Sequence, residues 1–248
     1  MATAKPYFIY PGFAFVCYPN RDSTPFRERY AIPEAQTVIR GTLRYQGFPE
    51  MIKVLVDIGF LSDEPRDFLS SSSSSPIAWN EATRQILGAT SSDEKDLAWA
   101  ISSKTTFANN EDRDRILGGL RWIGLFSASE QITPRANPLD TLCATLERKM
   151  QYEPHERDMV MLQHKFGIEH KNGQKETRTS TLCEFGVLGG YSAMAKTVGV
   201  PAAVAVKLVL DGTINKTGIL APSDMEICGP LLTTLKNDYG IEMIEKTL

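Results

Sequence analysis

Two arginines on one predicted strand are the residues of this sequence best placed to do chemistry. Side chains of a strand alternate between its two faces, so Val38, Arg40, Thr42 and Arg44 share one face. Four residues of strand separate the two arginines by roughly 13 Å, so they cannot clamp a single carboxylate together. They could instead meet two acidic groups of one extended ligand.

A plainer interpretation of the same arginines stays open at this point. Arginines on strands are mostly solvated or paired with a neighbouring Asp or Glu. Tyr45 follows the arginines on the opposite face of the strand. Asn20 and Arg21, in the turn at 19–23, are weaker candidates, because polar side chains of turns commonly bond the nearby backbone.

The elements that must position these residues lie in the stretch 37–60. A strand covers its first half, and Gly47 ends that strand. Pro49 occupies an early helical position where proline is tolerated, and Ile52 and Val56 continue the apolar spacing of a helix. The arginine-bearing face therefore runs directly into an amphipathic helix, and we expect the rest of the chain to be organised around this stretch.

Several segments resemble the substrate domain of the saccharopine reductase family. The resemblance is carried by AKPYFIYPGFAFVCYPNRDSTPF, RGTLRYQGFP, NPLDTLCATLERKM, ERDMVMLQHKF, TSTLCEFG, GGYSAMAKTVGVP, LVLDGTI and GILAP. These segments run through nearly the whole chain, so the resemblance does not depend on one short motif.

The resemblance implies a function, a cofactor and a set of binding residues. The family is the NADP-dependent, glutamate-forming saccharopine dehydrogenase, an oxidoreductase of lysine biosynthesis. By resemblance, Arg40 binds a carboxylate of saccharopine through a two-pronged contact that a lysine could not replace. Arg44, Thr42 and Tyr45 are expected beside it, with Asn20 and Arg21 as the weaker members of the substrate site. A homodimer in the cytoplasm is expected, whereas no general acid or base is assigned.

A dinucleotide-binding fingerprint is missing from the sequence. The glycine-rich segment 186–190 follows a predicted strand and opens a helix, but its G-x-x-G-G order is not G-x-G-x-x-G. The predicted strand is also a hairpin arm, and Ser192 is expected to cap the helix that follows. The sequence thus resembles the C-terminal portion of a family member, and we expect no NADP binding by this chain alone.

The predicted fold is α+β, with a mixed sheet that contains an antiparallel hairpin covered by helices. Asn172-Gly173 predicts the hairpin between strands at 158–171 and 174–182. Short strands are predicted at 7–10 and 13–18, a short helix at most at 24–30, and a brief helix ending at Leu69. Further helices are predicted at 79–87, 93–102, 110–123 and 137–150, and the serine run 70–75 is expected to be a flexible loop.

The C-terminal part is expected to behave differently from the rest. Residues 1–190 are predicted to form the substrate-binding and dimerisation domain, and residues 191–248 the segment that returns to the Rossmann domain in the family. The helix 192–210 is apolar on most sides and has Pro201 inside, which predicts a break or kink near Val200. His164 lies on the apolar face of its strand and is expected to be a core histidine.

Composition excludes several classes of function. The net charge is −3 and no basic run exceeds two residues, so binding to nucleic acid has no electrostatic support. We expect no apolar run to approach the roughly 18 residues needed to span a membrane. The four cysteines lack a CxxC pair and the three histidines form no ligand spacing with them, so we expect reduced, buried thiols and no metal.

Two alternatives to an enzyme part remain at this point. The chain could be a shortened, non-enzymatic copy that associates with itself or with a full-length partner. It could also be an incomplete piece of a longer gene product. A member of the wider family that acts on polyamines would need acidic residues where this sequence has arginines.

Overall fold

The computed structural model describes residues 3–70 and 76–248, so most of the predicted serine loop lies outside the described residues. The chain forms two compact units. Unit 1 contains residues 1–21 and 40–151, and unit 2 contains residues 22–39 and 152–248. This division follows packing, whereas the predicted boundary at residue 190 separates functional domains and stays a prediction.

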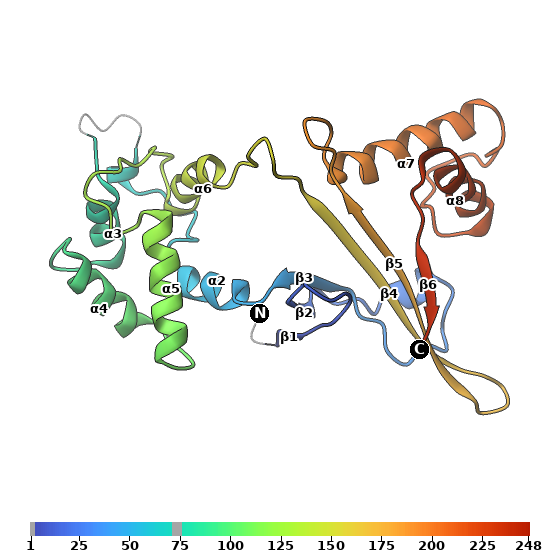
Figure 1. The fold of residues 1–248 in the computed structure, drawn as a ribbon, viewed down its shortest axis with the longest axis horizontal. Coiled ribbons are helices and arrows are strands. Elements are labelled where there is room, and N and C mark those ends of the chain that lie inside the picture. Colours follow the sequence, from blue (N-terminus) through green and yellow to red (C-terminus); the bar gives the residue numbers. More distant parts are fainter. Residues whose placement is uncertain (1–2, 71–75) are drawn as a thin grey trace. The chain divides into compact units, whose positions relative to one another are not determined.

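Unit 1 begins with a small antiparallel sheet (Figure 1). Its strands are β1 (Lys5–Pro6), β2 (Phe15–Pro19) and β3 (Gly41–Tyr45), in the order β1-β2-β3. The predicted strand at 7–10 is wrong, because the short β1 precedes those residues. The strand that carries the arginines is also shorter than predicted, since it begins at Gly41.

The rest of unit 1 is helical, as the sequence predicts, except that the brief helix predicted to end at Leu69 is only a 3₁₀ turn. The helices are α2 (Phe48–Asp57), a 3₁₀ turn η1 (Asp67–Leu69), α3 (Trp79–Leu87), α4 (Glu94–Lys104), α5 (Asn110–Ile123) and α6 (Pro138–Lys149). Asn109 and Asn137 cap α5 and α6 by accepting bonds from Asp112 and Asp140. Their apolar faces form one core, which includes the fully buried Phe60, Leu69, Trp79, Leu97, Leu120 and Leu125.

Unit 2 is built on a long antiparallel hairpin, as Asn172-Gly173 predicts. The hairpin pairs β4 (Met159–Glu169) with β5 (Lys175–Phe185), and β6 (Ile244–Thr247) adds to the other side of β5. The short α1 (Phe26–Arg29) also belongs to this unit. The α+β class is confirmed, but the described strands form two antiparallel sheets where one mixed sheet was predicted.

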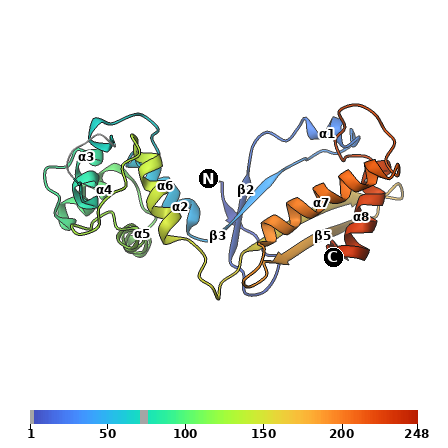
Figure 2. The same cartoon turned by 90° about the horizontal axis from the view of Figure 1, so that it is seen from above.

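Two helices lie over the hairpin of unit 2 (Figure 2). They are α7 (Ala193–Leu210) and α8 (Met225–Tyr239). Val204 and Leu208 of α7 pack with Leu182 of β5, while α8 contributes Ile227 and Leu235 to the same core. The predicted break does not occur, because α7 continues through Pro201.

Two expectations about unit 2 are wrong. His164 is exposed and its ring stacks on that of Phe166, with centroids 6.1 Å apart, so it is not a core histidine. Helix α7 has 18 residues with a mean hydropathy of 1.6, which suffices by length and composition to cross a membrane. The expectation that no apolar run approaches that length therefore does not hold.

Candidate functional site

The pairing of β2 with β3 brings several candidate residues together. Tyr18 lies opposite Thr42, and Val16 lies opposite Arg44. Beyond the strand ends, the backbone N–H of Asn20 donates to the carbonyl of Arg40 at 2.8 Å. Because opposed residues of an antiparallel pair share a face, Tyr18 joins Thr42 on the arginine face. The sequence analysis did not select Tyr18, although its strand alternation, aligned with β3, could have indicated it.

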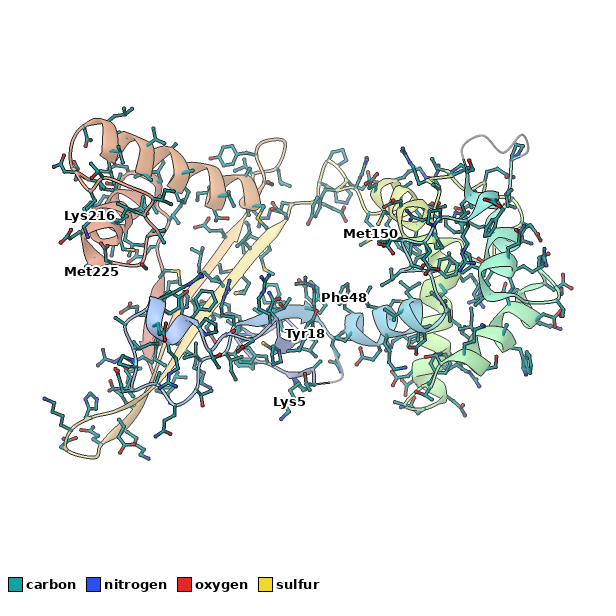
Figure 3. The ribbon with its side chains drawn as sticks, turned by 180° about the vertical axis from the view of Figure 1, so that it is seen from behind. Lys5, Tyr18, Phe48, Met150, Lys216 and Met225 are labelled. Carbon is teal, nitrogen blue, oxygen red and sulfur yellow. The ribbon has the colours of Figure 1, made fainter. Side chains whose placement is uncertain are left out.

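Arg44 is held by two contacts within its own neighbourhood. Its Nη1 donates to the carbonyl oxygen of Leu43 at 2.7 Å, and its guanidinium lies 5.5 Å from the centre of the Phe48 ring. Figure 3 shows Phe48 at the start of α2, in the same part of unit 1 as Tyr18 on β2. The side chain is exposed, so these contacts leave most of its donors facing water.

Arg44 has no carboxylate partner within the described part of the chain. The helices of unit 1 provide the contrast, since Arg84, Arg115 and Arg121 pair with Glu81, Asp112 and Glu94. The interpretation that a neighbouring acid neutralises Arg44 is therefore wrong. A solvated arginine and a ligand-binding arginine both remain compatible with this geometry.

Tyr45 does not join the arginines. It lies opposite Phe15, and the two ring centres are 5.3 Å apart. Phe13 also stacks on Phe15, with ring centres 5.5 Å apart. Tyr45 thus belongs to an aromatic cluster on the opposite face of β3.

Arg21 and Arg40 flank the segment 22–39, which belongs to unit 2, and both side chains are exposed. After Arg21, the carboxylate of Asp22 accepts bonds from the backbone and hydroxyl of Thr24 at 3.0 and 2.9 Å. Those bonds lower the pKa of Asp22. The predicted turn chemistry is therefore present beside Arg21.

Two glycines of the RGTLRYQGFP segment lie close to side chains of other elements. A β-carbon on Gly41 would lie 2.5 Å from Sγ of Cys17, so a larger residue there would have to displace that thiol. Gly47 adopts φ +93°, the left-handed region, and a β-carbon there would lie 2.6 Å from Nη1 of Arg115. Arg115 comes from α5, and no signal in the sequence connects it with this turn.

The glycine-rich segment before α7 serves a structural purpose. The carboxylate of Asp158 accepts bonds from the backbone N–H groups of Ala193 and Met194, at 2.7 and 2.9 Å. Ser192 caps the same helix at 3.0 Å, as predicted. A β-carbon on Gly186 would lie 2.3 Å from Oδ1 of Asp158, so glycine makes room for the carboxylate.

The capping of this helix prevents the segment from binding the phosphates of a dinucleotide. A phosphate bound there would need the same N–H donors that Asp158 and Ser192 already occupy. The bonds from Met194 and Ala193 lower the pKa of Asp158, so its carboxylate is charged and would repel a phosphate. The residues that the structure describes at this helix end do not fit NADP.

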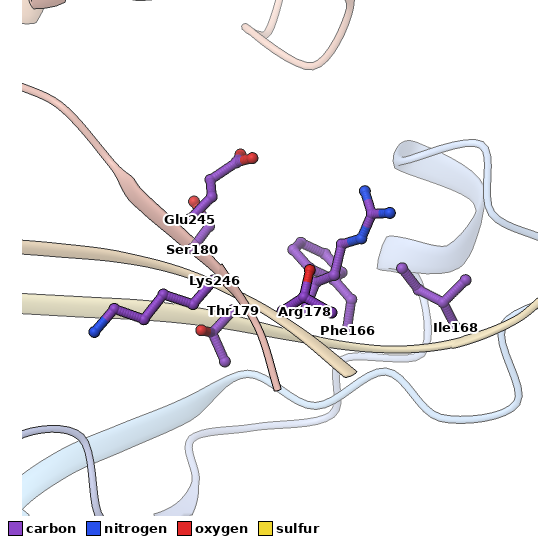
Figure 4. A pocket seen from close by; sticks show the side chains of 8 residues that line it. Phe166, Ile168, Arg178, Thr179, Ser180, Glu245 and Lys246 are labelled. Atoms are coloured by element: carbon purple, nitrogen blue, oxygen red, sulfur yellow. The ribbon is translucent and has the colours of Figure 1, made fainter. Parts of the chain in front are cut away.

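A hollow of about 350 Å³ lies on the sheet of unit 2 (Figure 4). Arg178 and Phe166 project from one side of the strands, whereas Lys246 and Thr179 project from the other. Nε of Arg178 is bonded to Glu176 at 2.8 Å. The lining side chains do not converge, and none of the predicted substrate residues is among them.

Metal-ligating residues do not gather in the described chain. Among residues 3–70 and 76–248, no group of three His, Cys, Asp or Glu side chains could hold a metal ion. The four cysteines are free thiols and half-buried, where buried ones were predicted. Burial raises the pKa of Cys17 and of Cys183, which makes both thiols poor nucleophiles.

Comparison with known proteins shows that the chain belongs to a known family. The family described as "Saccharopine dehydrogenase C-terminal domain" matches residues 1–241. Two curated relatives named saccharopine dehydrogenase [NADP(+), L-glutamate-forming] match 100% of the chain. The protein from Pyricularia oryzae is 63% identical, and the one from Saccharomyces cerevisiae is 62% identical. The chain spans 55% and 54% of their lengths.

A more distant relative and a solved structure agree with this match. The mitochondrial alpha-aminoadipic semialdehyde synthase of Bos taurus is 36% identical over 99% of the chain, which corresponds to 26% of that protein. The structure of apo histidine-tagged saccharopine dehydrogenase (L-Glu forming) from Saccharomyces cerevisiae superposes with a TM-score of 0.93. It is 62% identical, and the match covers 100% of this chain and 54% of that one.

Proposed function

Because the chain belongs to the family of saccharopine dehydrogenase C-terminal domains, we propose that it is the substrate-binding part of such an enzyme. The whole enzyme would condense aminoadipate semialdehyde with glutamate and reduce the imine with NADPH, in lysine biosynthesis. The observation that carries this proposal is the identity of 62–63% along the entire chain to two enzymes of that name.

The proposed task of this chain is to bind the acidic groups of the substrate. Saccharopine carries carboxylates from both of its precursors, and Arg40 and Arg44 would each bind one. Carboxylate anchors of this kind act mainly by positioning the reacting groups. Arg44 supports the assignment, because its guanidinium is ordered by Phe48 yet pairs with no acid among the described residues.

Calorimetric titration of saccharopine into the purified chain tests this task. Replacing Arg40 or Arg44 by Lys should weaken binding about tenfold, because a lysine cannot make a two-pronged contact. Arg113→Lys is the matched control, since Arg113 is bonded to the neighbouring Asp114 on the exposed side of α5. Unchanged binding in both strand variants would remove Arg40 and Arg44 from the site.

We propose that NADP binds elsewhere in the whole enzyme, in the half of the relatives that this chain does not match. Capping of α7 by Asp158 supports this view, because it leaves no free donors for a phosphate. The chain alone should oxidise no NADPH when given both substrates. Activity should appear when the N-terminal half of a relative is expressed with it, and turnover by the chain alone would refute the assignment.

We infer that the exposed side of α7 is covered by that same missing half and not by lipid. Val198 is 60% exposed, although Val204 on the same helix is buried in the core of unit 2. Lys196 is paired with Glu184 at 2.9 Å, which fixes the helix on its own sheet. Lipid-vesicle flotation checks this inference, and the chain should stay unbound.

A non-enzymatic association module is the second candidate, and the hairpin favours it. Strand β4 is eleven residues long and lies at the edge of its sheet, so one side of it has no neighbouring strand among the described residues. Leu162 and Phe166 on this strand are 47% and 50% exposed. We propose a homodimer that pairs these surfaces, as expected for the family. Light scattering after size-exclusion chromatography should give twice the mass of the chain, and a monomer would contradict it.

We propose a cytoplasmic location, in keeping with the sequence expectation. The four free thiols support a reducing compartment. Imaging of the full-length protein with a C-terminal fluorescent tag tests it, and signal confined to an organelle would overturn it.

A further inference from the structure

Phe48 lies against the guanidinium of Arg44 at the point where β3 turns into α2. Cζ of Arg44 is 5.5 Å from the ring centre, and Nη1 is bonded to the carbonyl of Leu43 at 2.7 Å. The ring restrains one face of the guanidinium and the carbonyl restrains one edge. An arginine has five N–H donors, so most remain for a ligand.

The turn between the two residues determines that contact. Gly47 adopts a left-handed conformation with φ +93°, which lets the chain fold from β3 into α2 within two residues. On one side, the N–H of Gln46 donates to the carbonyl of Ala14 at 2.8 Å. On the other side, Nη1 of Arg115 lies 3.5 Å from the Gly47 carbonyl. Phe48 therefore has a fixed place relative to Arg44.

The surroundings of Arg115 fix the turn further. Its Nη2 is bonded to Asp112 at 3.0 Å, so its guanidinium is itself held on α5. A β-carbon at residue 47 would lie 2.6 Å from Nη1, so this guanidinium would have to shift if residue 47 carried a side chain. The left-handed backbone of Gly47 and the contact from α5 thus both act on the turn.

We propose that Phe48 is a positioning residue, which holds the guanidinium of Arg44 in one orientation for a planar carboxylate of the substrate. This inference rests on the proposed function, because it assigns a ligand to Arg44. A flexible arginine loses conformational freedom when a ligand binds, and ordering it beforehand reduces that loss. Phe48 should accordingly affect the affinity for an acidic ligand without contacting the reacting atoms.

The competing explanation is that the pair only stabilises the fold. The chain contains a matched pair for comparison, because Arg157 lies 4.8 Å from the ring centre of Phe185. The two rings are similarly exposed, at 37% for Phe48 and 40% for Phe185. Replacing Phe185 removes the same kind of contact in unit 2, whereas the candidate residues of β3 belong to unit 1.

The experiment is a calorimetric titration of saccharopine into the full 248-residue chain and its variants. Phe48→Leu should raise Kd about three- to tenfold, whereas Phe48→Tyr, which keeps a ring, should bind within about twofold of the unchanged chain. Phe185→Leu should bind as the unchanged chain does. Thermal unfolding of all variants checks that each is folded.

A second measurement follows Arg44 directly, without ligand. In a ¹H–¹⁵N spectrum, the ring current of Phe48 should shift the Nε–H signal of Arg44, and Phe48→Leu should abolish that shift. A folded Phe48→Leu variant that binds normally would overturn the inference while the proposed function stands. Equal weakening by Leu and Tyr would also overturn it. An unchanged chain that binds no saccharopine would overturn the proposed function and, with it, the role given to Phe48.

Discussion

The helices of unit 1 and those of unit 2 differ in how far they bury their apolar residues. Helices α2 to α6 enclose a core in which Phe60 and Trp79 are fully buried, with ring centres 6.3 Å apart. Helix α7 is apolar on most sides, yet Val206 and Val209 are more than half exposed. The first set has apolar stripes that match one another, whereas the second has more apolar surface than its own unit covers.

This difference shows which part of the chain is complete in itself. A helix with one apolar stripe needs one covered side, and α3 and α5 obtain it within unit 1. A helix that is apolar on most sides needs cover on several of them, and unit 2 provides one sheet and α8. We therefore expect core substitutions in unit 1 to act on stability, and exposed substitutions in α7 to act on association.

The largest effect is expected from Trp79→Ala in the core of unit 1. Removing this fully buried ring should cost about 3–5 kcal/mol of unfolding free energy, because a cavity replaces it. Trp99 of α4, which is 74% exposed, is the matched control, and Trp99→Ala should change stability by less than about 0.5 kcal/mol. Urea titrations followed by circular dichroism compare the two. Similar losses would mean that the core is not closed as described.

A smaller loss is expected from Gly186→Ala in unit 2. The added methyl would lie 2.3 Å from Oδ1 of Asp158 and 3.2 Å from the amide of Ala193, which should cost about 1–3 kcal/mol. Gly199→Ala is the control with the opposite sign. A β-carbon there meets nothing within 4 Å inside helix α7, so stability should rise by about 0.5–1 kcal/mol. Thermal unfolding distinguishes them, and equal melting temperatures would contradict the capping role of Asp158.

Two valines of α7, two residues apart, allow buried and exposed positions to be compared within one helix. Val204 is buried and Val206 is exposed, so Val204→Thr should cost about 1–2 kcal/mol and Val206→Thr less than about 0.5 kcal/mol. In calorimetric titrations with the N-terminal half of a relative, Val206→Thr should weaken binding more than Val204→Thr does. If Val206→Thr leaves that affinity unchanged, the exposed side of α7 is not the surface that the N-terminal half of the relatives would cover.

Local signals predicted most of the elements correctly. Gly88 ends α3 in the left-handed conformation, and Asn172-Gly173 closes the hairpin with the predicted strands on either side. These features depend on a few adjacent residues, which a sequence displays directly. The error at His164 concerns burial, because the apolar face of a strand is buried only where another surface covers it.

Some features of the candidate site were likewise predictable from local sequence, and others were not. The spacing of Arg44 and Phe48 around Gly47 is local, so the strand-to-helix turn was predictable. The bond from Asn20 to Arg40 and the approach of Arg115 to Gly47 join segments far apart in sequence. They depend on strand register and helix packing, which alternation and periodicity do not determine. The place of Tyr45 on the opposite face was predictable, but its neighbour Phe15 was not.

The smallest predicted effect concerns an ion pair on the surface of unit 1. Arg84 donates from Nη2 and Nε to Glu81 at 2.7 and 2.8 Å, and this lowers the pKa of Glu81 from 4.5 to about 2. A lowered pKa in the folded state contributes stability above the unfolded value, and that contribution is lost as pH falls from about 4.5 to about 2. Both side chains are about one-third exposed, so the pair is worth only about 0.3–0.5 kcal/mol. Glu81→Gln and Arg84→Gln should each flatten the acid limb of the stability curve by this amount, and the double variant should flatten it no further. Additive losses would mean that the two charges act separately, and that the helices of unit 1 rely on burial alone.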